Sequence, residues 1–246
     1  MSGHSKWSKV KHQKGVTDAI KGKIFTKMAN AIAISVRESG NADPETNFKL
    51  RLAIEKARSM NMPKSNIDRA IARGSGEDDG ARFETVVYEA FAPEGVGMIV
   101  EAATDNKQRT VSILKNTLDR HGGTLAAQGA VSHLFRYVGF IEVDKSGKSF
   151  DSLMDIALNV GAEDIQDAGT SVDIYTKPTD LHKVKESLVK EGITVTDAEL
   201  IYQPIAWMSI TDPNKVSRLQ NLLETIEDLD DVQKVFANCD FPGLSS

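Results

Sequence analysis

The sequence has a single cysteine, no apolar run long enough to cross a membrane, and no arginine before Arg37. Cys239 alone excludes an intramolecular disulfide and any multi-cysteine zinc or iron–sulfur site, and it suits a reducing cytosol. The longest apolar runs, such as residues 98–100, fall far short of the roughly 20 residues that span a bilayer. The lysine-rich start has no apolar core, so we expect neither a secretory signal nor an Arg-rich transit peptide. These absences favour a cytoplasmic protein with no membrane contact.

Common enzyme signatures are also missing. The patterns GxxxxGK[ST], GxSxG and HExxH do not occur. The five histidines, at positions 4, 12, 121, 133 and 182, show no close metal-ligand spacing. We therefore expect no enzymatic activity, no metal and no cofactor.

Positive and negative charges are unevenly distributed along this chain of 246 residues. Residues 1–76 hold 15 Lys and Arg against 6 Asp and Glu, whereas residues 77–246 hold 15 against 29. The formal net charge of −5 therefore conceals a basic N-terminal third. Such a split indicates that one part of the chain meets a polyanion while the rest keeps the protein in solution.

The positive charge is densest at the N-terminus, where residues 1–27 carry seven lysines and one acid, Asp18. Lysines at this density neutralise phosphates along a nucleic-acid backbone. Trp7 either stacks on an exposed base or anchors the segment to the helices behind it. The alternative is a solvated lysine face. The predicted nucleic-acid-binding residues are Lys6, Trp7, Lys9, Lys11, His12, Lys14, Lys21, Lys23 and Lys27.

The basic third is predicted to be a small helical bundle. Thr17 or Asp18 caps a first helix that runs to about residue 39 and has a broad apolar arc. The pair Asp43-Pro44 predicts the start of a second helix, over residues 43–60. A third helix follows residue 63 and ends at Gly74. The glycine-rich, acidic residues 74–80 then form a linker, and the charge changes sign there.

After the linker the pattern is typical of strands. The expected elements are a hairpin of residues 83–91 and 96–103, a helix capped by Thr104 or Asp105, a strand 205–210, a helix from residue 212, and a strand 232–237. The segment between them repeats the pattern, with strands 132–137, 139–143, 163–165, 171–175 and 193–201 and helices near 150–160 and 181–188.

These elements predict an α+β protein in which one small α+β (ferredoxin-like) unit is inserted in another. The expected domains are a basic helical domain 1–76, a discontinuous domain 80–130 plus 203–246, and an inserted domain 131–202.

The polar stretch from Thr104 to Thr110 has two interpretations. It is either a ligand clamp or a capped helix start with an Asp105–Arg109 pair at i, i+4, and we favour the latter. The triplet His121-Gly122-Gly123 indicates a helix end.

Several motifs together resemble one known family, and the resemblance covers nearly the whole chain. The matching segments are residues 3–7, 11–12, 22–25, 61–67, 88–89, 104–106, 109–110, 121–123 and 131–132. They resemble the YebC/PmpR family, and Lys14-Gly15-Val16 and Gln108 depart from its usual residues.

The resemblance implies a helical N-terminal domain, two α/β domains, and a probable bacterial transcriptional regulator that binds DNA. Relatives that include the mitochondrial translational activator of cytochrome c oxidase act on the ribosome, and bacterial relatives assist translation of proline-rich stretches. The expected partner is therefore nucleic acid, either DNA or ribosomal RNA in association with the ribosome. The oligomeric state stays open.

Overall fold

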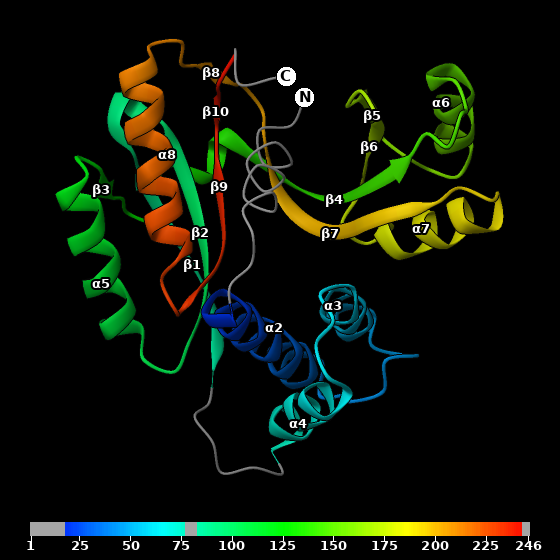
Figure 1. The fold of residues 1–246 in the computed structure, drawn as a ribbon, viewed down its shortest axis with the longest axis horizontal. Coiled ribbons are helices and arrows are strands. Elements are labelled where there is room, and N and C mark those ends of the chain that lie inside the picture. The colour runs from blue at the N-terminus through cyan, green and yellow to red at the C-terminus, as the bar shows by residue number, and fades with distance from the viewer. Residues whose placement is uncertain (1–17, 77–82, 243–246) are drawn as a thin grey trace. The chain divides into compact units, whose positions relative to one another are not determined.

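The computed structural model describes residues 18–76 and 83–242, which form an α+β fold, as predicted (Figure 1). Six predicted binding residues lie outside this part of the chain. They are Lys6, Trp7, Lys9, Lys11, His12 and Lys14. Of the described residues, 135–205 form one compact unit and the others form a second.

The second unit begins with three helices around one apolar core. They are α2 (Asp18–Ser39), α3 (Phe48–Ser59) and α4 (Lys64–Ser75). Every third or fourth residue on their facing sides is apolar, so each helix buries one stripe. The buried core consists of Ile32, Val36, Leu50, Ile54, Ala57, Met62, Ile67 and Ala70.

The predicted start of the second helix at Asp43-Pro44 is wrong, because the cap lies at Asn47. Asp43 instead closes a turn, accepting a hydrogen bond from Glu45 N at 3.0 Å. Asn47 is 5% exposed; its side-chain oxygen accepts from Leu50 N at 3.1 Å, and its amide donates to Ser35 O at 3.0 Å. The helix therefore begins where the cap can also bind α2.

The predicted end of the third helix at Gly74 is wrong, because Gly74 is a buried residue within α4. A Cβ on Gly74 would lie 2.6 Å from Ala33 O of α2. The helix ends instead at Gly76, whose φ of +81° is left-handed. Gly74 thus serves close packing, and Gly76 serves termination.

The same unit contains a four-stranded sheet of order β3-β1-β2-β9. Its strands are β1 (Glu84–Phe91), β2 (Gly97–Thr104), β3 (Thr124–Leu125) and β9 (Val232–Ala237). Helices α5 (Lys107–Arg120) and α8 (Pro213–Glu227) lie side by side along it (Figure 1). The hairpin β1–β2 turns at η1 (Pro93–Gly95), as predicted.

Two predictions for this part of the chain are wrong, the strand over residues 205–210 and the cap of α5. Residues 205–210 do not form a strand of this sheet; only β8 (Met208–Ser209) is extended, and it pairs in parallel with β10 (Cys239–Asp240) in a separate two-stranded sheet. The long-range partner of β2 is β9. The cap of α5 is Asn106, whose Oδ1 accepts from Arg109 N at 3.1 Å, rather than Thr104 or Asp105.

The compact unit of residues 135–205 has a second four-stranded sheet, of order β5-β6-β4-β7. Its elements are β4 (Phe135–Asp144), α6 (Phe150–Asn159), β5 (Asp164–Asp167), β6 (Ser171–Thr176), α7 (Leu181–Lys190) and β7 (Val195–Pro204). The two strands expected over residues 132–143 are one strand, β4, preceded by the short turn η2 (Ser132–Leu134). This β-α-β-β-α-β order with antiparallel pairing is the ferredoxin-like arrangement.

Candidate nucleic-acid interface

Three predicted binding residues, Lys21, Lys23 and Lys27, lie in the first turns of α2. Lys21 and Lys23 are exposed and Lys27 is half-buried. Lys23 and Lys27 are four residues apart, so they lie on the same side of the helix. Both side chains reach the C-terminal end of α8, which belongs to the same unit.

Lys23 and Lys27 bind the C-terminal end of α8. Lys23 Nζ donates to Asp228 O at 3.5 Å, and Lys27 Nζ donates to Glu227 O. The last carbonyls of a helix lack intrahelical partners and carry the negative end of its dipole, so cations are favourable there. These two lysines therefore have a structural role. Their binding to nucleic acid stays a prediction.

Two arginines of the helices bind Phe83, the first described residue after the acidic linker. Arg37 Nη1 donates to Phe83 O at 3.0 Å, and the Arg73 guanidinium lies 5.4 Å from the centre of the Phe83 ring. Arg73 Nη2 also donates to Oδ1 of the buried Asn30 at 2.8 Å. Part of the basic charge of residues 1–76 thus holds this unit together.

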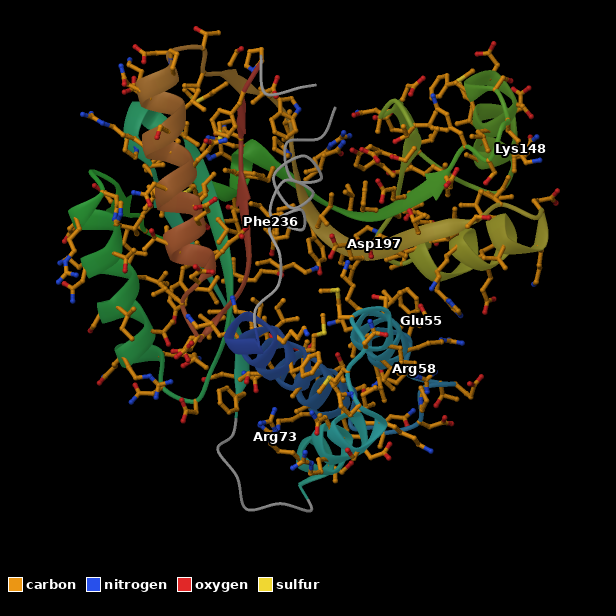
Figure 2. The ribbon with its side chains drawn as sticks, in the orientation of Figure 1. Glu55, Arg58, Arg73, Lys148, Asp197 and Phe236 are labelled. Carbon is orange, nitrogen blue, oxygen red and sulfur yellow. The ribbon has the colours of Figure 1, made fainter. Side chains whose placement is uncertain are left out.

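Exposed cations gather around the junction between α3 and α4, which the sequence reasoning did not single out. Arg58 and Lys64 flank it and are exposed (Figure 2 labels Arg58). Asn61 has a left-handed φ of 59°, and Pro63 at the cap of α4 offers no side-chain hydrogen bond to the first N–H groups. An uncapped helix start beside cations suits an anion. The motif of residues 61–67, which carries part of the family resemblance, spans this junction and is the sequence signal for it.

Other cations of the helices are engaged locally. Lys49 Nζ donates to Glu38 Oε2 at 2.8 Å, and Arg51 Nη2 donates to Glu45 O at 3.4 Å. Arg69 binds Asn66 Oδ1 and Ser65 O within its own helix. As the sequence predicted, α3 presents no single basic stripe of the kind that a groove-reading helix uses.

The polar stretch 104–110 forms the start of α5, as the favoured interpretation predicts, and its side chains bind partners within the protein. Arg109 Nη2 donates to Asp105 at 2.7 Å, the predicted i, i+4 pair, and also to Asp231 Oδ1 at 3.1 Å. Thr110 Oγ1 donates to Asp231 Oδ2 at 2.6 Å. Asp231 lies 122 residues from Arg109 in the sequence, so residue spacing could not predict this contact.

Glu89 is a buried carboxylate with a structural partner. It is 7% exposed and accepts hydrogen bonds from the backbone N–H groups of Gly129, Val131 and Ser132 at 2.7, 2.5 and 2.9 Å. Burial alone would raise the pKa of Glu89, but these three donors lower it below its ordinary value. The carboxylate thus fixes the segment that leads into β4.

Two kinds of reactive group were sought among the described residues, a metal-ligand cluster and an activated cysteine. No group of three or more His, Cys, Asp or Glu in residues 18–76 and 83–242 is placed to hold a metal ion. Cys239 is buried, and this burial raises the pKa of its thiol to about 12, so it is a poor nucleophile. The helices of the same ranges include none that is long and apolar enough to cross a membrane.

Comparison with known proteins matches both parts of the chain to one family. Residues 5–77 match the TACO1/YebC N-terminal domain, and residues 83–239 match the TACO1/YebC second and third domain. A probable transcriptional regulatory protein of Sulfurihydrogenibium is 45% identical over 243 residues, which are 98% of this chain and 96% of the relative. One of Aquifex aeolicus is 44% identical over 98% of this chain and 97% of the relative.

A solved structure shares the fold. The crystal structure of a conserved hypothetical protein from Aquifex aeolicus superposes with a TM-score of 0.83 at 44% identity, over 92% of each chain.

Proposed function

This chain belongs to the TACO1/YebC family, and we propose that it is a DNA-binding transcriptional regulator whose basic N-terminal third contacts the phosphate backbone. The observation that carries this proposal is the concentration of positive charge, 15 Lys and Arg against 6 acids, in residues 1–76. Relatives across nearly the full length are named probable transcriptional regulatory proteins. The exposed cations at the α3–α4 junction add a second contact region.

Some cations of residues 1–76 bind groups of their own unit, and this leaves a smaller set as phosphate contacts. Lys23, Lys27, Arg37 and Arg73 hold their own unit together. The lysines before α2 and the pair Arg58 and Lys64 are therefore the preferred phosphate contacts. Contacts to phosphate carry no sequence information, so binding through these residues should be nearly uniform across sequences.

A salt titration of binding tests the phosphate contacts. Changing Lys6, Lys9, Lys11 and Lys14 to Gln should reduce the slope of log K against log salt by about 3 to 4, at roughly 0.7–0.9 per phosphate. The matched control changes four exposed lysines outside the basic third, Lys115, Lys148, Lys183 and Lys190, to Gln. Both variants lose the same charge, so equal slopes would refute the proposed role of the N-terminal lysines.

One observation favours a second candidate, a translation factor that contacts ribosomal RNA. Helix α3 has its lysines and its arginines on different faces and so offers no single basic face for base readout, whereas RNA is often recognised through shape and phosphates. Crosslinking the protein in cells and sequencing the captured nucleic acid separates the two. Discrete promoter fragments would support transcription, and enrichment of ribosomal RNA would support translation.

A further inference from the structure

The three helices α2, α3 and α4 have the order and connections of a helix-turn-helix unit. Helix α2 packs against both α3 and α4, and a turn of four residues, 60–63, joins α3 directly to α4 (Figure 1). In DNA-binding units of this kind one helix crosses the phosphate backbone, and the helix after the turn enters the major groove with its N-terminal residues on the bases. The order along this chain gives the second role to α4.

The turn between α3 and α4 is anchored by its own backbone and by the core. Asn61 has a left-handed φ of 59°, a conformation that glycine and asparagine adopt most easily. Asn61 N donates to Arg58 O and Met62 N donates to Ala57 O, each at 2.9 Å. Met62 is 6% exposed and belongs to the core of the three helices. The turn therefore fixes the direction in which α4 leaves α3.

One face of α4 is buried and the opposite face is exposed. The buried face consists of Ile67, Ala70 and Gly74, and Gly74 lies in close contact with α2. Ser65 and Arg69 are four residues apart and therefore lie together on the opposite side of the helix, where both are exposed. The first two turns of α4 thus present a polar stripe away from the core.

The side chains of this stripe are of the types that read base edges. Arginine donates two hydrogen bonds to guanine O6 and N7, serine binds several base edges, and an aspartate such as the exposed Asp68 accepts from cytosine N4. Arg69 Nε donates to Ser65 O at 3.3 Å and its Nη2 donates to Asn66 Oδ1, so the guanidinium is held over the first turn of α4. These two bonds use two of its five donors, and each Nη keeps a donor for a guanine.

We propose that α4 enters the major groove of duplex DNA, where Arg69 and Ser65 contact base edges while Arg58 and Lys64 bind the flanking phosphates. The major groove of B-DNA admits an α-helix, whereas the major groove of A-form RNA is too deep and narrow for side chains to read. Arg58 and Lys64 are exposed on either side of the turn, as phosphate contacts beside an inserted helix must be.

This inference rests on the proposed function and adds base readout to it. Phosphate contacts alone would bind all duplexes alike, whereas contacts from Arg69 and Ser65 to bases would favour particular sequences. Sequence preference is therefore the property that distinguishes the two.

Selection of bound duplexes from a random-sequence DNA pool tests base readout by the full-length protein. Wild type should enrich a motif with a required guanine, and Arg69→Ala should reduce the preference for that guanine by about 5- to 150-fold. Arg69→Lys keeps the charge but loses the planar fork, so it should lose the same preference. Arg58→Ala is the matched control, because loss of a phosphate contact should weaken binding to all sequences alike and keep the motif.

Disulfide trapping on a duplex from the selected pool locates α4 in the groove. The single native cysteine, Cys239, is buried and the pKa of its thiol is raised to about 12, so it stays unreactive. Ser65→Cys should couple to a thiol tethered to cytosine N4, in the major groove, and not to one tethered to guanine N2, in the minor groove. Ser75→Cys, exposed at the other end of α4, should couple to neither.

The outcomes separate this inference from the proposed function. Equal binding of all duplexes, with no enriched motif, would overturn base readout by α4 and leave phosphate binding intact. A motif that survives both Arg69 variants, or coupling of Ser65→Cys only in the minor groove, would also overturn it. Failure of wild type to bind any duplex would overturn both. Because Arg69 is exposed and Arg69→Lys preserves its charge, loss of the motif in that variant cannot be attributed to loss of folding.

Discussion

Gly74 of α4 lies so close to Ala33 of α2 that a side chain on Gly74 would clash with the backbone. A Cβ there would be 2.6 Å from Ala33 O and 2.7 Å from Val36 Cβ. Two helices can approach this closely only where one of them has no side chain. This contact closes the three-helix core.

Gly74→Ala should therefore destabilise the protein, by about 1–3 kcal/mol, because overpacking outweighs the gain in helix propensity. Gly22→Ala is the matched control in α2, since nothing lies within 4 Å of its added Cβ. That change should stabilise by about 0.5–1 kcal/mol. Urea unfolding of both variants checks the opposite signs, and a stabilising Gly74→Ala would contradict the close contact.

Glu89→Gln should lower the free energy of unfolding by about 1–3 kcal/mol at pH 7, because three backbone donors lose their charged acceptor. The pKa of Glu89 lies below its ordinary value of 4.5 in the folded protein. Its contribution is therefore fully present above pH 4.5 and is lost as the pH falls through the lower, folded pKa.

Unfolding measured between pH 7 and pH 3 tests this sign. The difference in free energy of unfolding between wild type and Glu89→Gln should become smaller below pH 4.5. The exposed Glu191→Gln serves as the control and should change stability by no more than about 0.5 kcal/mol. A gap that widens on acidification would show that the folded carboxylate has a raised pKa.

Asp231→Asn should cost about 1–3 kcal/mol, because Asp231 accepts from Thr110 at 2.6 Å and its side chain is only 14% exposed. Asp105→Asn should cost less, since Asp105 contacts the same Arg109 but is 31% exposed. Thermal unfolding of the two variants ranks them. A larger loss of stability in Asp105→Asn than in Asp231→Asn would mean that the i, i+4 pair of Asp105 with Arg109 contributes more to stability than the contacts of Asp231.

Changing Lys23 and Lys27 together to Gln should reduce stability by about 1 kcal/mol, because both cations bind the carbonyl end of α8. Changing Lys9 and Lys11 to Gln should leave the free energy of unfolding unchanged. Chemical unfolding distinguishes a structural pair from a purely ligand-binding one. Equal stability of the two double variants would leave Lys23 and Lys27 available to nucleic acid alone.

Replacing residues 135–205 with a short Gly/Ser linker should leave a protein that unfolds cooperatively. Leu134 lies against Gly97, Gly97 N donates to Asn238 Oδ1 at 2.8 Å, and Met208 N donates to Asn238 O at 2.7 Å, so the two cut ends are near neighbours. A replacement that starts at residue 131 also removes two donors to Glu89 and should be less stable. An aggregated product of the first replacement would show that the domains predicted from sequence do not fold independently.

Periodicity located most elements within a few residues. The helix from Asp18 to Ser39, the hairpin β1–β2 and the end of α5 at His121 are all set by neighbours in sequence, through apolar spacing, turn residues and caps. The errors fall where a residue serves a distant partner, as Asn47 does by binding α2. The binding residues before α2 lie outside the described residues and stay predictions.

The α+β class and the concentration of positive charge in residues 1–76 can be read from the amino-acid sequence alone, because both depend on composition and local spacing. Three features require the folded chain: the pairing of β9 with β2, the contact of Arg109 with Asp231, and the binding of Lys23 and Lys27 to the end of α8. The partners in these contacts are more than 100 residues apart. Local patterns report which face of an element is buried, whereas its partner is chosen by packing of the whole chain.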